Sequence, residues 1–305
     1  MPIVVNSNAS ATSASFNLSR ANDSLRSSLE RLSSGKKINR SGDDAGGLAV
    51  AYKLESKGKR TKATMQNMQN ALSYLQVQDG AMQTLGNIFD RMAQLRVMAG
   101  DVTKNSGDVE NYSKEFVELQ LQMDQMNNQK FNGLSLFAMN GAPPSNNGTK
   151  EIVAYQKPDG SPSTYQKFGR TLQVDPSGSG GSISINVINL EHVISYEALA
   201  GPVKLNAAGY AERITDFTIS QMTDVMEKIA DARAENGGEQ NRVMQSLEFT
   251  EVNYVNLEAA HGRIMDTDIA AESTRFSRNN VLVQASAAMT AQANQLTNVA
   301  LTLIQ

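Results

Sequence analysis

The chain has 305 residues, and its 28 lysines and arginines are nearly balanced by 31 aspartates and glutamates, which leaves a formal charge of −3 at pH 7. This balance excludes the global basic field of a nucleic-acid-binding protein, so we expect no nucleic-acid partner. The absence of cysteine excludes thiolate metal sites and a cysteine nucleophile, and the two histidines, His192 and His261, are too far apart in sequence for a histidine-rich metal cluster, so we expect no cofactor and no enzymatic activity.

The first residues break their apolar run after Val5 and lack the apolar core of a cleaved secretory signal. No apolar stretch reaches the roughly 18 residues that a membrane-spanning helix needs. We therefore expect no membrane partner. If the protein leaves the cell, we expect an export route that does not read a cleaved signal.

The first predicted element is a helix over residues 9–32. Apolar residues recur in it every seven positions, and small residues stand three positions after the first three of them; the two sets are Ala11, Leu18, Leu25 and Leu32, and Ala14, Ala21 and Ser28. This pattern is typical of a coiled coil in which the helices approach closely. If this helix pairs with a helix at the other end of the chain, the apolar residues are too few to offset the entropy of ordering both helices. We therefore expect the two helices to pack against copies of themselves.

A break follows this helix. Ser34 and Gly35 are predicted to end it, because glycine commonly stops a helix, and Asp43, beside Asp44, is predicted to cap the next helix. Residues 35–47 therefore separate the first helix from the next one. The terminal segments, residues 1–34 and 270–305, are predicted to form a coiled-coil pair, and residues 48–140 and 205–269 a second helical part.

Four stripes of apolar residues, spaced three or four positions apart, predict four inner helices with one buried face each. Two stripes run over residues 68–92 and 109–126, and two over residues 222–232 and 243–264. Most of the methionines lie on these stripes, where we expect them to fill the core.

The middle of the chain differs in composition from both helical arms. Six of the seven prolines lie between Pro143 and Pro202. Short β-strand signals occur over residues 152–155, 171–174 and 182–187. We therefore predict a small β-rich surface insert over residues 141–204.

At the C-terminus the predicted inner helix carries a second heptad stripe, formed by Leu282, Met289, Leu296 and Leu303. Between Phe276 and Gln305 the only charged side chain is Arg278, which disfavours a helix that lies on a membrane, because such a helix needs a basic face. The fold predicted from the whole pattern is mainly α: long antiparallel helices, with a terminal coiled-coil pair and a helical bundle, and a small β-rich insert in the middle.

Three groups of residues resemble a known family. Residues 28–49, SLERLSSGKKINRSGDDAGGLA, closely resemble the N-terminal core motif of bacterial flagellins, and residues 129–133, QKFNG, and 263–272, RIMDTDIAAE, stand where that family has matching pieces. The resemblance covers roughly residues 1–137 and 205–305. It implies a structural subunit that self-assembles into the bacterial flagellar filament for swimming motility.

The resemblance also implies partners and sites. The chain itself, as a helical homopolymer, is the expected main partner, together with flagellar cap and hook–filament junction proteins, an export chaperone and the flagellar type III apparatus; the expected location is the extracellular filament. The residues expected to mediate self-assembly are Leu18, Leu25, Leu32, Leu282, Met289, Leu296 and Leu303. The resemblance also implies that residues 35–47 are a connector between an inner coiled-coil core and an outer helical core, and the residues expected to form it are Ser34, Gly35, Asn39, Asp43 and Asp44.

Residues 90–99 resemble the segment that an animal innate immune receptor recognises in flagellins. The segment keeps Arg91 and Leu95, but it has Gln94 and Met98 where the stimulatory pattern has glutamate and glutamine. Arg91 and Leu95 are therefore candidate receptor residues.

Other functions fit the sequence less well. A hook–filament junction protein shares flagellin-like termini, but the long C-terminal match over residues 263–305 favours a flagellin. A zinc protease carried on the insert would need a His-Glu-x-x-His motif, which the sequence lacks. A membrane-active helical effector is disfavoured by the nearly uncharged C-terminal helix.

Overall fold

The computed structural model describes residues 8–138, 148–156, 162–176, 181–194 and 214–302. The chain divides into two compact units, one formed by residues 1–59 and 254–305 and the other by residues 60–253. Among the described helices, none has the length and apolar character needed to cross a membrane.

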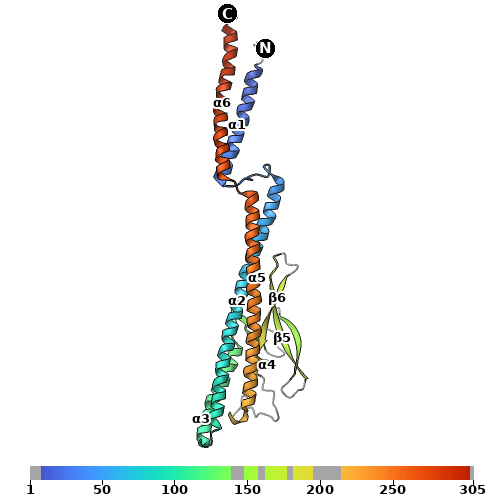
Figure 1. The fold of residues 1–305 in the computed structure, drawn as a ribbon, viewed down its shortest axis with the longest axis vertical. Helices are drawn as coiled ribbons and strands as arrows, with labels where there is room; N and C mark the ends of the chain where they lie inside the picture. The colour runs from blue at the N-terminus through green and yellow to red at the C-terminus, as the bar shows by residue number, and fades with distance from the viewer. Residues whose placement is uncertain (1–7, 139–147, 157–161, 177–180, 195–213, 303–305) are drawn as a thin grey trace. The chain divides into compact units, whose positions relative to one another are not determined.

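In the first unit, helix α1 (Ala9–Ser34) and helix α6 (Ile269–Thr302) lie side by side and run in opposite directions (Figure 1). The side chain of Asn8 caps α1 by accepting a hydrogen bond from the N–H of Ala11 at 2.9 Å. At the other end Gly35 has a φ of 69°, a left-handed conformation that glycine adopts without strain, and its N–H donates to the carbonyl of Arg31. The predicted end of the first helix at Ser34 and Gly35 is confirmed.

Three long helices contribute to the core of the second unit: α2 (Ala45–Ala99), α3 (Ser106–Asn127) and α5 (Ile219–Met265). Their predicted apolar stripes meet in one core, in which the fully buried side chains include Met68, Leu75, Phe89, Phe116 and Val243. Helix α3 begins with a reciprocal cap, in which the side chain of Asn105 accepts from the N–H of Asp108 at 2.8 Å and the Asp108 carboxylate accepts from the N–H of Asn105 at 3.3 Å. The predicted core role of the methionine stripes is confirmed.

The prediction of four inner helices is wrong, because the stripes over residues 222–232 and 243–264 both lie on α5. Between the stripes there is no proline, and Gly237 and Gly238 are the residues there that weaken a helix most. Each glycine costs a helix about 1 kcal/mol relative to alanine. Buried apolar side chains on both sides, at Ile229 and Val243, offset this cost, so α5 remains one continuous helix across the two glycines.

Two small sheets complete the described part of the second unit. In the first, β1 (Lys130–Phe131) and β2 (Leu134–Ser135) form a hairpin, and its turn residues Asn132 and Gly133 have positive φ angles of 49° and 79°, as expected for an Asn-Gly turn. The second sheet has the strand order β3-β6-β5-β4 and consists of β3 (Phe137–Ala138), β4 (Gly148–Gln156), β5 (Pro162–Gln173) and β6 (Ser182–Asn189). Strand β3 pairs with β6 in parallel, and the other pairs are antiparallel.

The predicted strand signals lie in this second sheet. Residues 152–155 and 182–187 fall inside β4 and β6, and residues 171–174 overlap the end of β5. Strand β5 begins well before its signal, at Pro162, because its first half pairs with β4. A short helix, α4 (Leu190–Ile194), and a 3-10 turn, η1 (Ile214–Asp216), follow the sheet, and β5 and β6 lie alongside α5 (Figure 1). The predicted fold class, mainly α with a small β-rich insert, is confirmed.

Candidate functional site

The heptad residues of α1 pack against α6 of the same chain. Leu18, Leu25 and Leu32 are half-buried, and Ser28, on the same face, is almost fully buried. Two hydrogen bonds cross between the helices: Asn279 Nδ2 donates to Ser28 Oγ at 3.2 Å, and Asn8 Nδ2 donates to the carbonyl of Ala293 at 2.9 Å. The three predicted leucines of α1 are therefore part of the intramolecular helix pair.

Helix α6 turns a different set of residues toward α1. The buried and half-buried positions recur every three or four residues: Glu272, Phe276, Asn279, Val283, Ser286, Thr290 and Ala293. The predicted stripe lies on another face, because Leu282 and Met289 are 48% and 65% exposed, and Val281 is exposed beside them. We call Val281, Leu282 and Met289 the outer apolar face of α6. The side chains of Leu296 and Leu303 lie outside the described part of the chain.

A buried carboxylate lies near the start of α6. Glu272 is 2% exposed; its Oε2 accepts from Arg275 Nη1 at 3.1 Å, and its Oε1 has no hydrogen-bond partner. Asp268 caps the helix by accepting from the N–H groups of Ala270 and Ala271 at 2.9 and 3.1 Å. The first unit therefore buries a carboxylate at the start of α6, and burial of a charged group is less favourable than burial of an apolar side chain.

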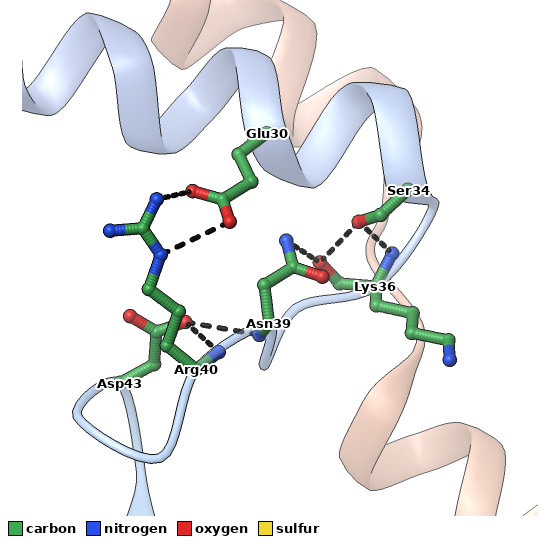
Figure 2. A network of polar contacts seen from close by, with 6 residues as sticks. All are labelled: Glu30, Ser34, Lys36, Asn39, Arg40 and Asp43. Carbon is green, nitrogen blue, oxygen red and sulfur yellow. Dashed lines mark hydrogen bonds and ion pairs between the residues drawn. The ribbon is translucent and has the colours of Figure 1, made fainter.

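The connector between α1 and α2 is a hydrogen-bonded turn (Figure 2). The carboxylate of Asp43 accepts from the N–H groups of Asn39 and Arg40 at 3.0 and 3.1 Å. These backbone hydrogen bonds, from Arg40 and then Asn39, lower the pKa of Asp43 below its ordinary value of 3.8. The guanidinium of Arg40 reaches back to α1 and binds both oxygens of Glu30, at 3.2 and 2.8 Å. The connector is thus joined to α1 by side chains as well as by the backbone.

The residue that caps α2 is Asp44, and the prediction of Asp43 as the cap is wrong by one position. Oδ1 of Asp44 accepts from the N–H of Gly47 at 2.8 Å, and its carbonyl accepts the first helical hydrogen bond, from Leu48. Either aspartate has the chemistry of a cap. The carboxylate of Asp43 is occupied by the turn at residues 39 and 40, which leaves Asp44 to cap the helix.

The connector also pairs with the chain segment that links α5 to α6. The N–H of Lys37 donates to the carbonyl of Met265 at 2.6 Å, and the N–H of Thr267 donates to the carbonyl of Gly35 at 3.0 Å. Below this backbone contact, Ile38, Ala51 and Met265 form a small buried apolar cluster. The two segments that lead out of α1 and into α6 are therefore fastened to each other within the first unit.

The second unit has a polar groove between the sheet and α5, with a volume of about 480 Å³. Four of its charged groups are engaged with one another or with polar groups of β6: Lys167 pairs with Glu235, the carboxylate of Glu239 accepts from the N–H of Asn186 at 2.9 Å, and Arg242 donates to the carbonyl of Ser184. Burial raises the pKa of Glu239 above its ordinary value of 4.5. The contacts attach β5 and β6 to α5, and among the described residues there is no group of three histidine or carboxylate side chains arranged to hold a metal ion.

The two candidate receptor residues differ in accessibility. Leu95 is fully buried in the core of the second unit. Arg91 is half-exposed on α2, and its Nε donates to Glu115 Oε1 on α3 at 2.7 Å. The folded chain therefore presents Arg91 at this position and keeps Leu95 for core packing.

Sequence and structure comparisons identify related proteins. The model of the bacterial flagellin N-terminal helical region matches residues 5–142, and that of the C-terminal helical region matches residues 219–304. A flagellar filament 33 kDa core protein of Treponema phagedenis is 29% identical over 99% of this chain and 100% of its own length. Flagellin FlaB2 of Treponema pallidum is 30% identical with the same coverage. A solved structure of a putative flagellar hook-associated protein from Vibrio parahaemolyticus shares the fold, with a TM-score of 0.55 and 15% identity over 73% of this chain and 100% of that one.

Proposed function

The chain belongs to the bacterial flagellin family, and we propose that it joins other copies of itself through the outer apolar face of α6 and the exposed side of α1. Its function is that of a structural subunit of the flagellar filament. A hook–filament junction protein is not favoured, because the relatives matched over their full length are filament proteins, whereas the hook-associated structure is similar in fold alone.

The observation that carries the proposal is the exposure of apolar residues on a helix that belongs to the terminal pair. Val281, Leu282 and Met289 share a face of α6 that stays exposed in the single chain, and α1 exposes Phe16 and Leu29. Burial of one large apolar side chain contributes about 1.5–3 kcal/mol. A second copy that covers these faces would supply the stability that the polar pair between α1 and α6 lacks.

The leucines of α1 have an indirect role in this proposal. Leu18, Leu25 and Leu32 pack against α6, the helix whose other face exposes Leu282 and Met289. Leu296 and Leu303 continue the same heptad in the sequence and are proposed to take part in self-assembly. The connector residues, from Ser34 to Asp44, are proposed to hold the terminal pair to the start of α2.

Family membership supports the remaining partners. We propose an extracellular filament built by the flagellar type III apparatus, with an export chaperone, cap proteins and hook–filament junction proteins as partners, and no catalytic activity. Receptor recognition is proposed to involve Arg91, since Leu95 has no exposed surface. Immunogold labelling of intact cells tests the location: label along external filaments supports it, and label confined within the cell envelope contradicts it.

The central experiment is assembly of the purified full chain after addition of filament seeds, observed by electron microscopy. The wild-type chain is expected to form long filaments, whereas short rings would indicate a junction protein. The double variant Leu282→Asp and Met289→Asp is expected to remain monomeric, because two charges replace the outer apolar face. Val102→Asp, at a fully exposed position next to α2, is the control and should assemble normally. Filaments from the double variant would refute the assignment of this face.

A further inference from the structure

The face that α6 turns toward α1 is unusually polar for the interface of a helix pair. Among the seven buried or half-buried positions between Ile269 and Gln295, the part of α6 whose side chains are described, only Phe276 and Val283 have large apolar side chains. The more apolar residues of the helix point away from α1, as the exposure of Leu282 and Met289 demonstrates. A helix pair usually buries its more apolar face, so some feature must favour this orientation.

Leucine heptads alone do not determine how two helices align. Leu18, Leu25 and Leu32 are spaced by seven, so sliding α1 by one heptad replaces each leucine by another residue of the same stripe and keeps most of the apolar contacts. The backbone pairing of Gly35 and Lys37 with residues 265–267 opposes such a slide at one end of the pair. Along the seam itself, a polar contact that cannot be remade after the slide makes the alternative alignments unfavourable as well.

The hydrogen bond from Asn279 to Ser28 has this property. Ser28 is 4% exposed, and its Oγ accepts from Asn279 Nδ2 at 3.2 Å. One heptad away on α1 stand Ala21 and Gly35, and neither has a side chain that can accept a hydrogen bond. A slide in either direction would leave the amide of Asn279 in the seam without this partner, which costs more than a lost exposed contact.

We propose that the Ser28–Asn279 contact, together with the backbone pairing of the connector, sets the register and orientation in which α6 pairs with α1, and so keeps the outer apolar face available to a second copy. The last part rests on the proposed function; the first part does not. The contact between Asn8 and the carbonyl of Ala293 supports the same alignment from the far end of α1. Asn279 acts here as a positioning residue, since it directs other side chains toward the neighbouring copy.

The chain has no native cysteine, so engineered cysteine pairs report the register without background. Ala21→Cys with Val283→Cys places both thiols on the seam between the two hydrogen-bonded contacts and reports the observed alignment. Ala14→Cys with Val283→Cys reports a slide of one heptad. Each pair is introduced into the full chain, oxidised under identical conditions before and after seeded assembly, and quantified as intramolecular disulfide by mass spectrometry.

In the otherwise wild-type chain the disulfide between the cysteines introduced at positions 21 and 283 is expected to dominate. Asn279→Leu should raise the ratio of slid to observed disulfide about tenfold, which corresponds to about 1.4 kcal/mol of register preference. Asn280→Leu makes the same chemical change at the adjacent, exposed position and should leave the ratio unchanged. The exchanged pair Ser28→Asn with Asn279→Ser restores a polar contact and should restore the wild-type ratio.

The proposal is overturned if Asn279→Leu leaves the ratio of slid to observed disulfide unchanged. It is also overturned if the disulfide between positions 21 and 283 forms in the otherwise wild-type chain neither before nor after seeded assembly. The two proposals can fail separately. If the wild-type chain forms no filaments but Asn279→Leu shifts the ratio, the assembly proposal fails and the register proposal stands. If filaments form and the ratio does not shift, the register proposal fails.

Discussion

Gly47 in the first turn of α2 allows a test of the connector by the addition of one methyl group. A methyl group added there would lie 2.4 Å from Oδ2 of Asp44 and 3.1 Å from Cδ1 of Ile38. The carboxylate of Asp44 is the cap of α2 and holds the N–H of Gly47 itself. Gly47→Ala must therefore displace the cap, although alanine is a better helix former than glycine.

The expected energies are of similar size and opposite sign. Loss of a cap costs about 0.5–2 kcal/mol, and alanine in place of glycine gains at most about 1 kcal/mol. We expect Gly47→Ala to change the local opening free energy by little or to lower it by up to about 1 kcal/mol. Gly46→Ala is the matched control, since its methyl would meet Asp44 at an ordinary 3.6 Å and should stabilise the helix by up to about 1 kcal/mol.

Hydrogen exchange of the amides over residues 44–50 is the suitable assay, because it reports local opening rather than the average over two units. The decisive measurement is Gly47→Ala in an Asp44→Ala background. With no carboxylate to displace, only the 3.1 Å approach to Cδ1 of Ile38 opposes the added methyl, so Gly47→Ala should now stabilise the first turn, by somewhat less than Gly46→Ala does. The reasoning is refuted if Gly47→Ala stabilises the wild-type chain as much as Gly46→Ala.

Three further predictions concern the second unit. Gln78→Leu should lower the free energy of unfolding in urea by about 2–4 kcal/mol, because buried Gln78 donates to the carbonyl of Leu136 and accepts from Asn236, whereas Gln76→Leu at an exposed position should change it little. Burial raises the pKa of Tyr74 from 10.0 to about 12, so stability is retained below pH 10 and should fall as the pH rises from 10 to 12; Tyr74→Phe should remove this part of the pH dependence in urea unfolding. Leu95→Ala should cost about 2–5 kcal/mol of stability and Arg91→Ala less than about 1 kcal/mol, so an effect of Leu95→Ala on receptor activation without loss of stability, measured by reporter assay and urea unfolding, would contradict its core role.

The amino-acid sequence by itself determined the features that depend on local backbone preference and on spacing. Gly35 ends α1 because a left-handed residue is needed there, and the prolines clustered between Pro143 and Pro202 exclude a long helix from the middle of the chain. The stripes of α2 and α3 predicted the core correctly, because a buried helix face must be apolar at helical spacing.

Only the tertiary structure decided between choices that look equal in sequence. Asp43 and Asp44 are equally good caps until the turn at residue 39 occupies one of them. The two stripes of α5 predicted two helices, but the buried side chains on both sides of Gly237 stabilise one continuous helix. On α6 the apolar heptad was the obvious seam, yet the polar residues face α1. The spacing of residues along a helix shows which side chains share a face of that helix. Which face becomes buried depends on the surface that packs against it, and that surface is formed by residues far away in the chain.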